Sequence, residues 1–379
     1  MPRVRLVQFS TVGVVANMPG ARDEKDPNHQ QDIRYVFKLN NWILGSIGIW
    51  PISIRGIGRH VSKVAIVFGN FTLSFAMVPC ALHIIYDEKN IIMKLKLCGL
   101  MAFCLTAMTK YCILVIRRPK ILRCIECIKN DWWQVMFTSD REMMLKYATI
   151  GRNLTIISAS FMYTAGIIYY MILIPFFSET KINNQTVRPF VYPTYSEFRQ
   201  SQISPIYEIV YGAHCICGYI MYSITVGACG LAALFATHAC GQIQVIVSRL
   251  EELLNDESPN IHQRIAVIVK DHVRIIRFST VVEEVLQEVC LVEFASSVCT
   301  ICLLEYYCIV SSQIGSICYM IKWYQLSPRS VRSLILIIVM SSHPIKLSAG
   351  RMADLSLSTF GNVLKTSVAY LSFLRTLVM

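Results

Sequence analysis

The sequence predicts an all-α protein, a polytopic bundle of transmembrane helices, and three observations lead to this fold class. Apolar runs of 20 or more residues recur along the chain, long enough to cross about 30 Å of hydrocarbon at about 1.5 Å per residue. Charged residues make up 16% of the chain, whereas a soluble domain carries about a quarter. The mean hydropathy is +0.48, so too little polar surface is present to cover a soluble globule of 43.1 kDa.

Residues 1–63 are predicted to form a cytoplasmic tail that contains one amphipathic segment. The tail begins polar, and its early apolar run is too weak for a cleaved signal peptide. The stretch from Tyr35 to Pro51 places Trp42 and Trp50 eight residues apart, roughly on one face of a helix. Such a segment suits the membrane interface or a buried cytoplasmic layer.

About six transmembrane spans are evident. Five lie within residues 64–310, and the second is expected to stop at Arg117-Arg118-Pro119. A weaker last span, within residues 352–379, includes Lys365. The expected bounds are about 64–86, 95–116, 154–176, 209–237, 289–310 and 355–378.

The charges of the loops indicate that the N-terminus is cytoplasmic, because cytoplasmic loops are enriched in Lys and Arg. Three segments hold nine, eight and five such residues, and the two between them hold three each. The basic segments are 1–63, 117–152 and 249–277, and the others are 87–96 and 177–207. The sequon at Asn184 falls in a loop assigned to the outside, which predicts a glycosylation site there.

This charge pattern breaks down after the fifth span. The segment 311–351 is rich in Lys and Arg and is therefore of cytoplasmic type, yet the fifth span should end outside. A further crossing would need about 20 residues. Only about a dozen separate Val310 from Lys322.

Three other functional classes are not predicted. The net charge of +12 is spread over the loops and does not form a stripe, so no nucleic-acid partner is expected. Most of the 15 cysteines lie in apolar runs, and neither Cys124-x-x-Cys127 nor Cys299-x-x-Cys302 has a second pair to complete a metal site. The chain has no HExxH, GxSxG or phosphate-binding glycine loop, so we expect no catalytic residue, no cofactor and no enzyme.

Several motifs lie near the two ends of the chain. They are Tyr35–Leu44, Gly48–Pro51, Trp323-Tyr324 before Pro328, Pro344–Gly350, Leu355–Tyr370 and Leu374-Arg375. Together they resemble the signatures of insect odorant receptors, especially hymenopteran ones. The spans between them fit the same family, so the resemblance covers roughly residues 32–379.

The resemblance implies seven helices, with the N-terminus inside and the C-terminus outside. It implies a tetrameric cation channel in the plasma membrane of the olfactory neuron dendrite. In that family a tuning subunit binds a small volatile odorant and a common co-receptor completes the pore. The short 249–277 loop is similar to that of a tuning subunit. The last helix lines the family's pore, which makes these residues pore-lining candidates: Val363, Lys365, Thr366, Ser367 and Tyr370.

The departure from the family coincides with the break in the charge pattern. In the family, an outer loop and a sixth span follow the segment that ends here at Val310. In this chain Val310 runs almost directly into Gln313–Trp323, so about 30 residues, the whole sixth helix, are expected to be missing. A skipped exon or an incomplete gene would explain this. The alternative function is therefore a non-functional or truncated receptor isoform.

An odorant cavity should be apolar with a few polar groups. The outer ends of the third and fourth spans supply aromatic candidates for ligand binding, namely Tyr163, Tyr170, Tyr211, His214 and Tyr219, with Tyr169 and Tyr222 nearby. Interfacial aromatic residues and helix packing are the alternative interpretation of each. Lys110, Glu293 and Glu305 also lie in spans, where a charge costs about 2.5–3.5 kcal/mol, so they need partners or a wet cavity.

Two other membrane classes fit the sequence less well. A G-protein-coupled chemoreceptor also has seven helices, but it predicts the opposite loop charge, a Cys in the second outer loop, and Asp-Arg-Tyr and Asn-Pro-x-x-Tyr motifs that are absent here. A transporter predicts paired broken helices from an inverted repeat, and no such repeat is visible.

Overall fold

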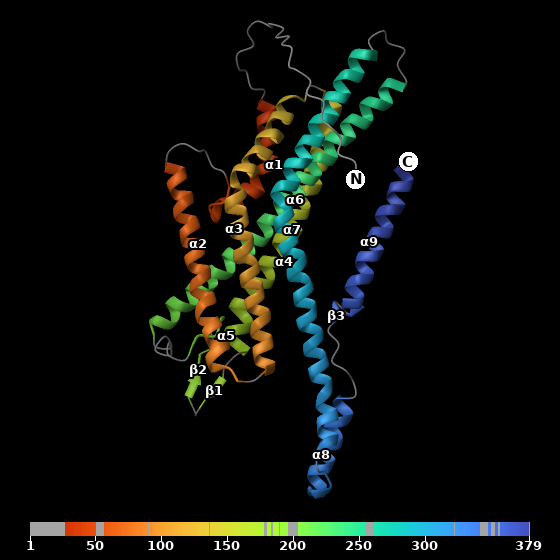
Figure 1. The fold of residues 1–379 in the computed structure, drawn as a ribbon. Coiled ribbons are helices and arrows are strands. Elements are labelled where there is room, and N and C mark those ends of the chain that lie inside the picture. Colours follow the sequence, from red (N-terminus) through yellow and green to blue (C-terminus); the bar gives the residue numbers. More distant parts are fainter. Residues whose placement is uncertain are drawn as a thin grey trace, which may run out of the picture.

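The computed structural model confirms an all-α architecture (Figure 1). The structure describes residues 27–50, 57–89, 91–135, 137–177, 180–182, 185–188, 190–195, 204–254, 261–321, 323–341, 348–349, 353–354 and 357–378. The strands in these ranges form two short antiparallel pairs. β1 (Thr180–Ile182) pairs with β2 (Gln185–Val187), and β3 (Ser348–Ala349) pairs with β4 (Ala353–Asp354).

Long helices account for most of the described residues. They are α1 (Pro27–Ser46), α2 (Ile57–Leu82), α3 (Ile91–Trp133), α4 (Thr138–Ile167), α6 (Ile206–Leu254), α7 (Ile261–Met320), α8 (Pro328–Ser341) and α9 (Leu357–Val378). The shorter ones are the π-helical turns η1 (His83–Asp87) and η2 (Ile168–Leu173), α5 (Ile174–Phe177) and the 3₁₀ turn η4 (Trp323–Gln325).

Five of these helices are long and apolar enough to cross a membrane, and each overlaps one of the first five spans expected from the sequence. They run over His60–Asp87, Met93–Trp133, Thr138–Leu173, Ile206–Leu253 and Ile261–Tyr306. α9 is not among them, because Asn362, Lys365, Thr366 and Ser367 dilute its apolar residues. α3 also continues through Pro119, so the expected stop at Arg117-Arg118-Pro119 does not end the helix.

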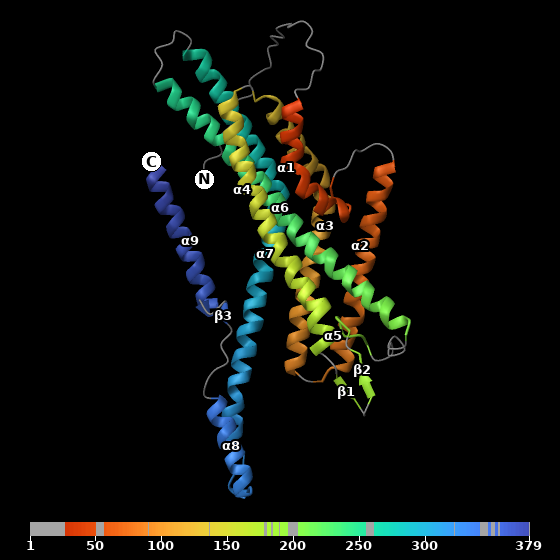
Figure 2. The ribbon, with the colours of Figure 1, turned by 180° about the vertical axis from the view of Figure 1, so that it is seen from behind.

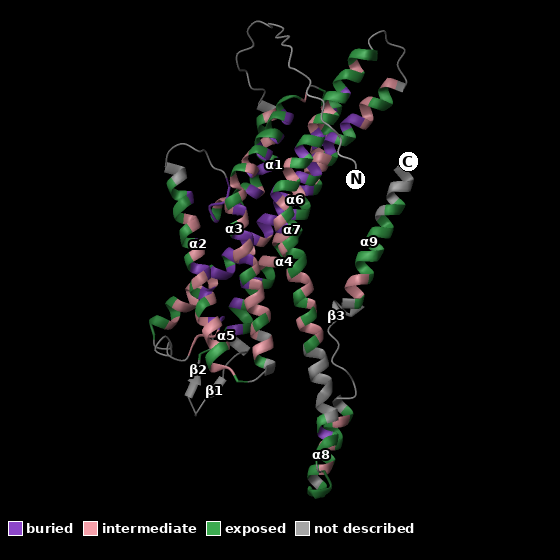
Figure 3. Cartoon of the chain, viewed as in Figure 1, coloured by how far each residue is buried: buried purple, intermediate pink, exposed green. Residues whose placement is uncertain are grey.

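α6 lies at the centre of the bundle, with α2, α3, α4 and α7 around it (Figures 1 and 2). Of its most apolar stretch 61% is buried inside the protein, against 28% or less for the other four spans. Buried residues accordingly gather where α1 and α3 cross α6 (Figure 3). The outward faces of the surrounding helices are apolar and exposed, as lipid contact requires.

α1 packs directly on α6 because α6 has glycines where the two helices meet. A Cβ at Gly230 would lie 2.9 Å from Thr155 Cγ2 and would overlap the Asn40 amide, which donates a hydrogen bond to the Gly230 carbonyl (3.4 Å). Leu44 lies against Gly227 in the same way and is fully buried. The amphipathic segment is therefore part of the core.

The two tryptophans of this segment do not share a face, which corrects the sequence prediction. α1 ends at Ser46, and the chain turns at Gly48, whose φ of 76° suits glycine. Trp50 follows the turn and is 8% exposed, whereas Trp42 on the helix is 66% exposed. Residues eight apart share a face only on a continuous helix, and the turn at Gly48 ends the helix between the two tryptophans.

α7 is a single helix of 60 residues that passes without a break through residues 310–312. At about 1.5 Å per residue it is roughly 90 Å long, about three times the thickness of a bilayer core. Its last part extends beyond the bundle, where α8 packs against it, and α9 then runs antiparallel to α7 (Figures 1 and 2). In the described residues no helix returns along the bundle between α7 and α8.

Candidate ligand-binding site

Aromatic side chains from several elements contact one another. The elements that carry them come together toward the end of the bundle where α5, β1 and β2 lie (Figure 1). These side chains come from α2, α3, α4, η2, α6 and the connecting segment 190–195, and we call them the aromatic cluster. Its members are Phe75, Phe103, Tyr163, Tyr169, Tyr170, Phe190, Tyr192, Tyr207, Tyr211, His214, Tyr219 and Tyr222. All five ligand-binding candidates from the sequence belong to it.

Tyr170 is the most connected member of the cluster. Its hydroxyl lies 2.8 Å from that of Tyr192, and its ring meets Tyr222 edge-on, with centroids 6.3 Å apart. The Tyr211 hydroxyl donates a hydrogen bond to the backbone carbonyl of Tyr170. Tyr170 belongs to the π-helical turn η2, a distortion that is frequent at functional sites. The turn brings a buried ring and an accepting carbonyl to the face of α6.

Tyr163 and Tyr219 form a second pair across α4 and α6. Their rings stack with centroids 6.0 Å apart. The Tyr163 hydroxyl lies 2.9 Å from Ser223 Oγ, and the Tyr219 hydroxyl donates to Ser46 Oγ at 3.0 Å. Both hydroxyls therefore have a partner within the protein, and Tyr219 is 40% exposed.

His214 is 2% exposed and is surrounded by rings. The ring centroids of Tyr192, Phe190 and Phe75 lie 5.1, 5.8 and 6.4 Å from that of the imidazole. Among the described residues none accepts from or donates to His214 Nδ1, although this atom is buried. Among the described members of the cluster, this is the one buried polar atom without a hydrogen-bond partner.

The sequence analysis missed Phe190 and Tyr192, which close the cluster from the connecting segment. Tyr192 is 1% exposed, and burial raises the pKa of its hydroxyl, which stays protonated and can donate to Tyr170. The signal was present, since Phe190, Val191 and Tyr192 form an apolar run between two prolines in an otherwise polar loop.

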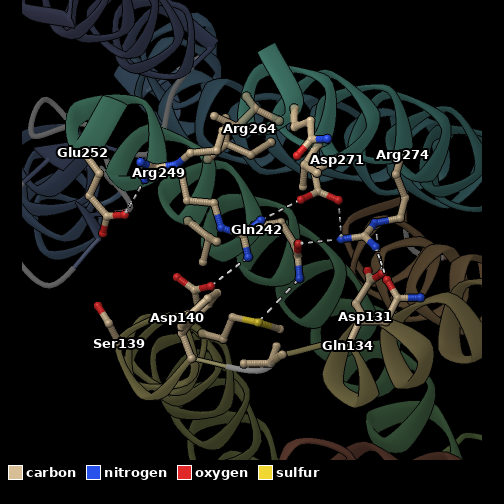
Figure 4. Close-up of a pocket in the computed structure, with 18 residues that line it drawn as sticks. Asp131, Gln134, Ser139, Asp140, Gln242, Arg249, Glu252, Arg264, Asp271 and Arg274 are labelled. Atoms are coloured by element: carbon tan, nitrogen blue, oxygen red, sulfur yellow. Dashed lines mark hydrogen bonds and ion pairs between the residues drawn. The ribbon is translucent and has the colours of Figure 1, made fainter. Parts of the chain in front are cut away.

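A cavity of about 720 Å³ lies at the opposite end of the bundle, between the ends of α3 and α6 and the starts of α4 and α7 (Figure 4). Arg249 bridges Asp140 and Asp271 at 2.8 and 2.7 Å. Arg274 contacts Asp131 and Asp271, and Asp131 also contacts His238 at 2.9 Å. A cavity lined by paired charges does not suit an apolar odorant, because the ligand would displace water from those charges without replacing its hydrogen bonds.

The family model described as 7tm Odorant receptor matches residues 95–322, which is more than half of the chain. The chain belongs to the odorant receptor family. The match ends before α8 and α9. No curated protein matches the sequence of this receptor.

Two solved structures resemble this receptor in fold. Olfactory receptor OR5 from Machilis hrabei superposes with a TM-score of 0.54 and 17% identity, covering 92% of this chain and 99% of that chain. The same receptor in complex with eugenol gives a TM-score of 0.52 and 14% identity, covering 92% and 100%. At these identities the likeness establishes the fold of this receptor, which is that of a multi-pass membrane protein.

The pore-lining candidates lie in the stretch of α9 from residue 362 to residue 370, which is exposed on all sides (Figure 3). Val363 is 56% and Tyr370 66% exposed, and Lys365, Thr366 and Ser367 between them are exposed as well. Phe360, one helical turn earlier, contacts Phe294 of α7 at 6.1 Å between centroids. Asn184, the predicted glycosylation site, lies outside the described residues.

Two of the three ionisable residues singled out within the spans form an ion pair. Lys110 of α3 is 2% exposed and contacts Glu293 of α7. Two further ion pairs join α3 to α7 closer to the charged cavity. They are Arg117–Glu288 and Lys120–Glu284. Where the structure is described, no group of three or more His, Cys, Asp or Glu side chains could hold a metal ion.

Replacing Gly218 with Ala is expected to destabilise the aromatic cluster. A Cβ there would lie 2.5 Å from Tyr170 Cζ, and the Tyr170 ring is buried and hydrogen-bonded, so it cannot move aside freely. Overpacking of this kind costs about 1–3 kcal/mol. Gly212→Ala on the same helix is the control, since nothing lies within 4 Å of its Cβ position. The midpoint of thermal unfolding should fall only for Gly218→Ala, and equal midpoints would contradict the packing.

Proposed function

We propose that this odorant receptor is a tuning subunit that binds a small volatile odorant, and that it forms a cation channel with a common co-receptor when the sixth helix expected from the family is present. The observation that carries the proposal is the aromatic cluster, which offers rings, hydroxyls and one unpaired imidazole nitrogen at a single end of the bundle. Ligand sites are typically apolar and aromatic with a few polar groups. We propose no catalytic role.

The location of the cluster supports this assignment. It lies at the end that the loop charges assign to the outside, which a volatile ligand reaches first. The Machilis hrabei receptor of similar fold is in complex with eugenol in one of the two structures described above. The short connection between α6 and α7, residues 255–260, is consistent with a tuning subunit. We place the receptor in the plasma membrane of the sensory dendrite, with a glycan at Asn184 and Val363, Lys365, Thr366, Ser367 and Tyr370 beside the ion path.

Direct binding to the purified full-length receptor in lipid nanodiscs tests the ligand site. A panel of volatile alcohols, phenols, esters and aldehydes should raise the midpoint of thermal unfolding for at least one compound, because a ligand that binds only the folded state stabilises it. Replacing the stacked pair by Tyr163→Ala and Tyr219→Ala should remove about half or more of that stabilisation.

The control for this double variant is Tyr324→Ala, which truncates an exposed tyrosine on η4. The control should keep the full ligand-dependent shift. If no compound of the panel stabilises the receptor, odorant binding by this chain is refuted. If the double variant keeps the shift unchanged, the ligand site lies elsewhere.

A further inference from the structure

His214 Nδ1 requires an explanation, because an unsatisfied buried polar atom is costly. The atom is shielded by the rings of Phe75, Phe190 and Tyr192, and within the described part of the chain it has no hydrogen-bond partner. Leaving such an atom unpaired costs about 1–3 kcal/mol. Unsatisfied atoms are rare in native proteins and point to a function or a missing partner. A partner that arrives with a ligand would account for it.

The chemistry of imidazole narrows the class of ligand. In the neutral ring Nδ1 is either an N–H donor or a bare acceptor, depending on the tautomer. A hydroxyl group can accept from the first and donate to the second, so it pairs with Nδ1 in either tautomer. The surrounding rings suit an apolar or aromatic body attached to that hydroxyl.

We propose that His214 is the polar anchor for odorants that carry a hydroxyl group, alcohols or phenols, whose apolar part packs among Phe75, Phe190 and Tyr192. The proposal rests on the proposed function and specifies the ligand class of the same site. His214 is then a residue that determines specificity within the cluster. It recognises the hydroxyl, and the rings recognise the rest of the ligand.

In the proposed complex, the connecting segment 190–195 is the part of the cluster that moves to admit a ligand to His214. This segment forms no helix or strand, so its backbone is not held by a regular hydrogen-bond ladder. It nevertheless supplies Phe190 and Tyr192, two of the three rings around the imidazole. Admitting a ligand therefore requires displacement of these two rings and loss of the Tyr192–Tyr170 hydrogen bond, but it does not require α2 to separate from α6.

A thermodynamic cycle measures the interaction free energy between the imidazole and the ligand hydroxyl. In this cycle the two groups are removed one at a time and then together. The probes are two pairs of similar shape: 4-ethylphenol with 4-ethyltoluene, and 1-octanol with nonane. Apparent affinities are measured by thermal stabilisation of the full-length receptor in nanodiscs, for wild type and for His214→Phe. The wild-type preference for the hydroxyl compound should fall about tenfold in His214→Phe, because one hydrogen bond is lost.

Two further variants separate the loss of a hydrogen bond from damage to the fold. His214→Asn keeps a donor and an acceptor near the position of Nδ1, so it should retain most of the preference. His272→Phe makes the same exchange at an exposed position of α7 and should leave the preference unchanged. Should His214→Phe fail to fold, His214→Asn and His214→Leu give the same comparison.

The outcomes distinguish the two proposals. If hydroxyl compounds bind with a preference that His214→Phe abolishes and His214→Asn keeps, the anchor is established. If odorants stabilise the receptor but the preference is absent, or is the same in wild type and His214→Phe, the anchor is refuted and the ligand site stands. If no volatile compound of any class binds, both proposals are refuted.

Discussion

Inserting one membrane-crossing helix between Val310 and Ser311 is expected to convert a silent receptor into one that carries odorant-evoked current with the co-receptor. In the present chain α7 passes through this junction unbroken, and α9 runs antiparallel to it. The basic segment around α8 is then carried to the end opposite the other basic loops, against the charge rule. One added crossing of about 20 apolar residues reverses both α8 and α9.

The measurement is whole-cell current in oocytes that express the co-receptor together with either form of the receptor. The control is an inserted hairpin of two crossings, which adds more apolar sequence but leaves the direction of α9 as it is. Only the single insertion should produce current and move an epitope after Met379 to the outside of intact cells. Odorant-evoked current from the unaltered chain would refute the interpretation that a helix is missing.

Replacing Glu293 with Gln is expected to lower the free energy of unfolding by about 3 kcal/mol, the second-largest effect that we predict. The ammonium group of Lys110 is almost fully buried within the bundle, and Glu293 is the carboxylate that contacts it. A neutral amide leaves this charge without its counter-ion in a low-dielectric environment. Thermal unfolding of the purified receptor in nanodiscs gives the measurement.

Glu288→Gln is the matched control, because Glu288 lies on the same helix and also forms an ion pair between α7 and α3. Its partner, Arg117, is partly exposed, and solvent screens an exposed ion pair, so this loss should be much smaller. Adding Lys110→Met to a Glu293→Leu variant should recover most of the lost stability, because no charge then remains buried. Glu293 is itself 52% exposed, so the predicted difference depends on the burial of Lys110, and equal losses for Glu293→Gln and Glu288→Gln would contradict it.

The sequence was sufficient to locate the five spans, because their signal is local. A run of apolar residues long enough to cross a bilayer can be recognised without knowing its neighbours. The ends of the helices were less predictable. Helices α3 and α6 continue through charged sequence to Trp133 and Leu254, since that sequence contains strong helix formers and Pro119 does not stop α3.

The aromatic candidates were also predictable, but their pairing was not. The spacing of Tyr163 and Tyr170, seven residues apart, suggests that they share a face of one helix. It does not indicate that Tyr163 stacks on Tyr219 and that Tyr170 meets Tyr192. These contacts join distant parts of the sequence, and so does the pair of Lys110 and Glu293. Periodicity shows which side of a helix is apolar, but it does not identify the residue on the neighbouring helix.

The packing of α1 on α6 has a consequence for biosynthesis. Asn40 and Gly230 are 190 residues apart, so the surface that α1 needs does not exist when α1 leaves the ribosome. At about 5–20 residues per second, the wait is roughly 10–40 seconds. During that time the apolar side of α1 is exposed to water or rests on the lipid surface, where a chaperone or the translocation machinery can engage it.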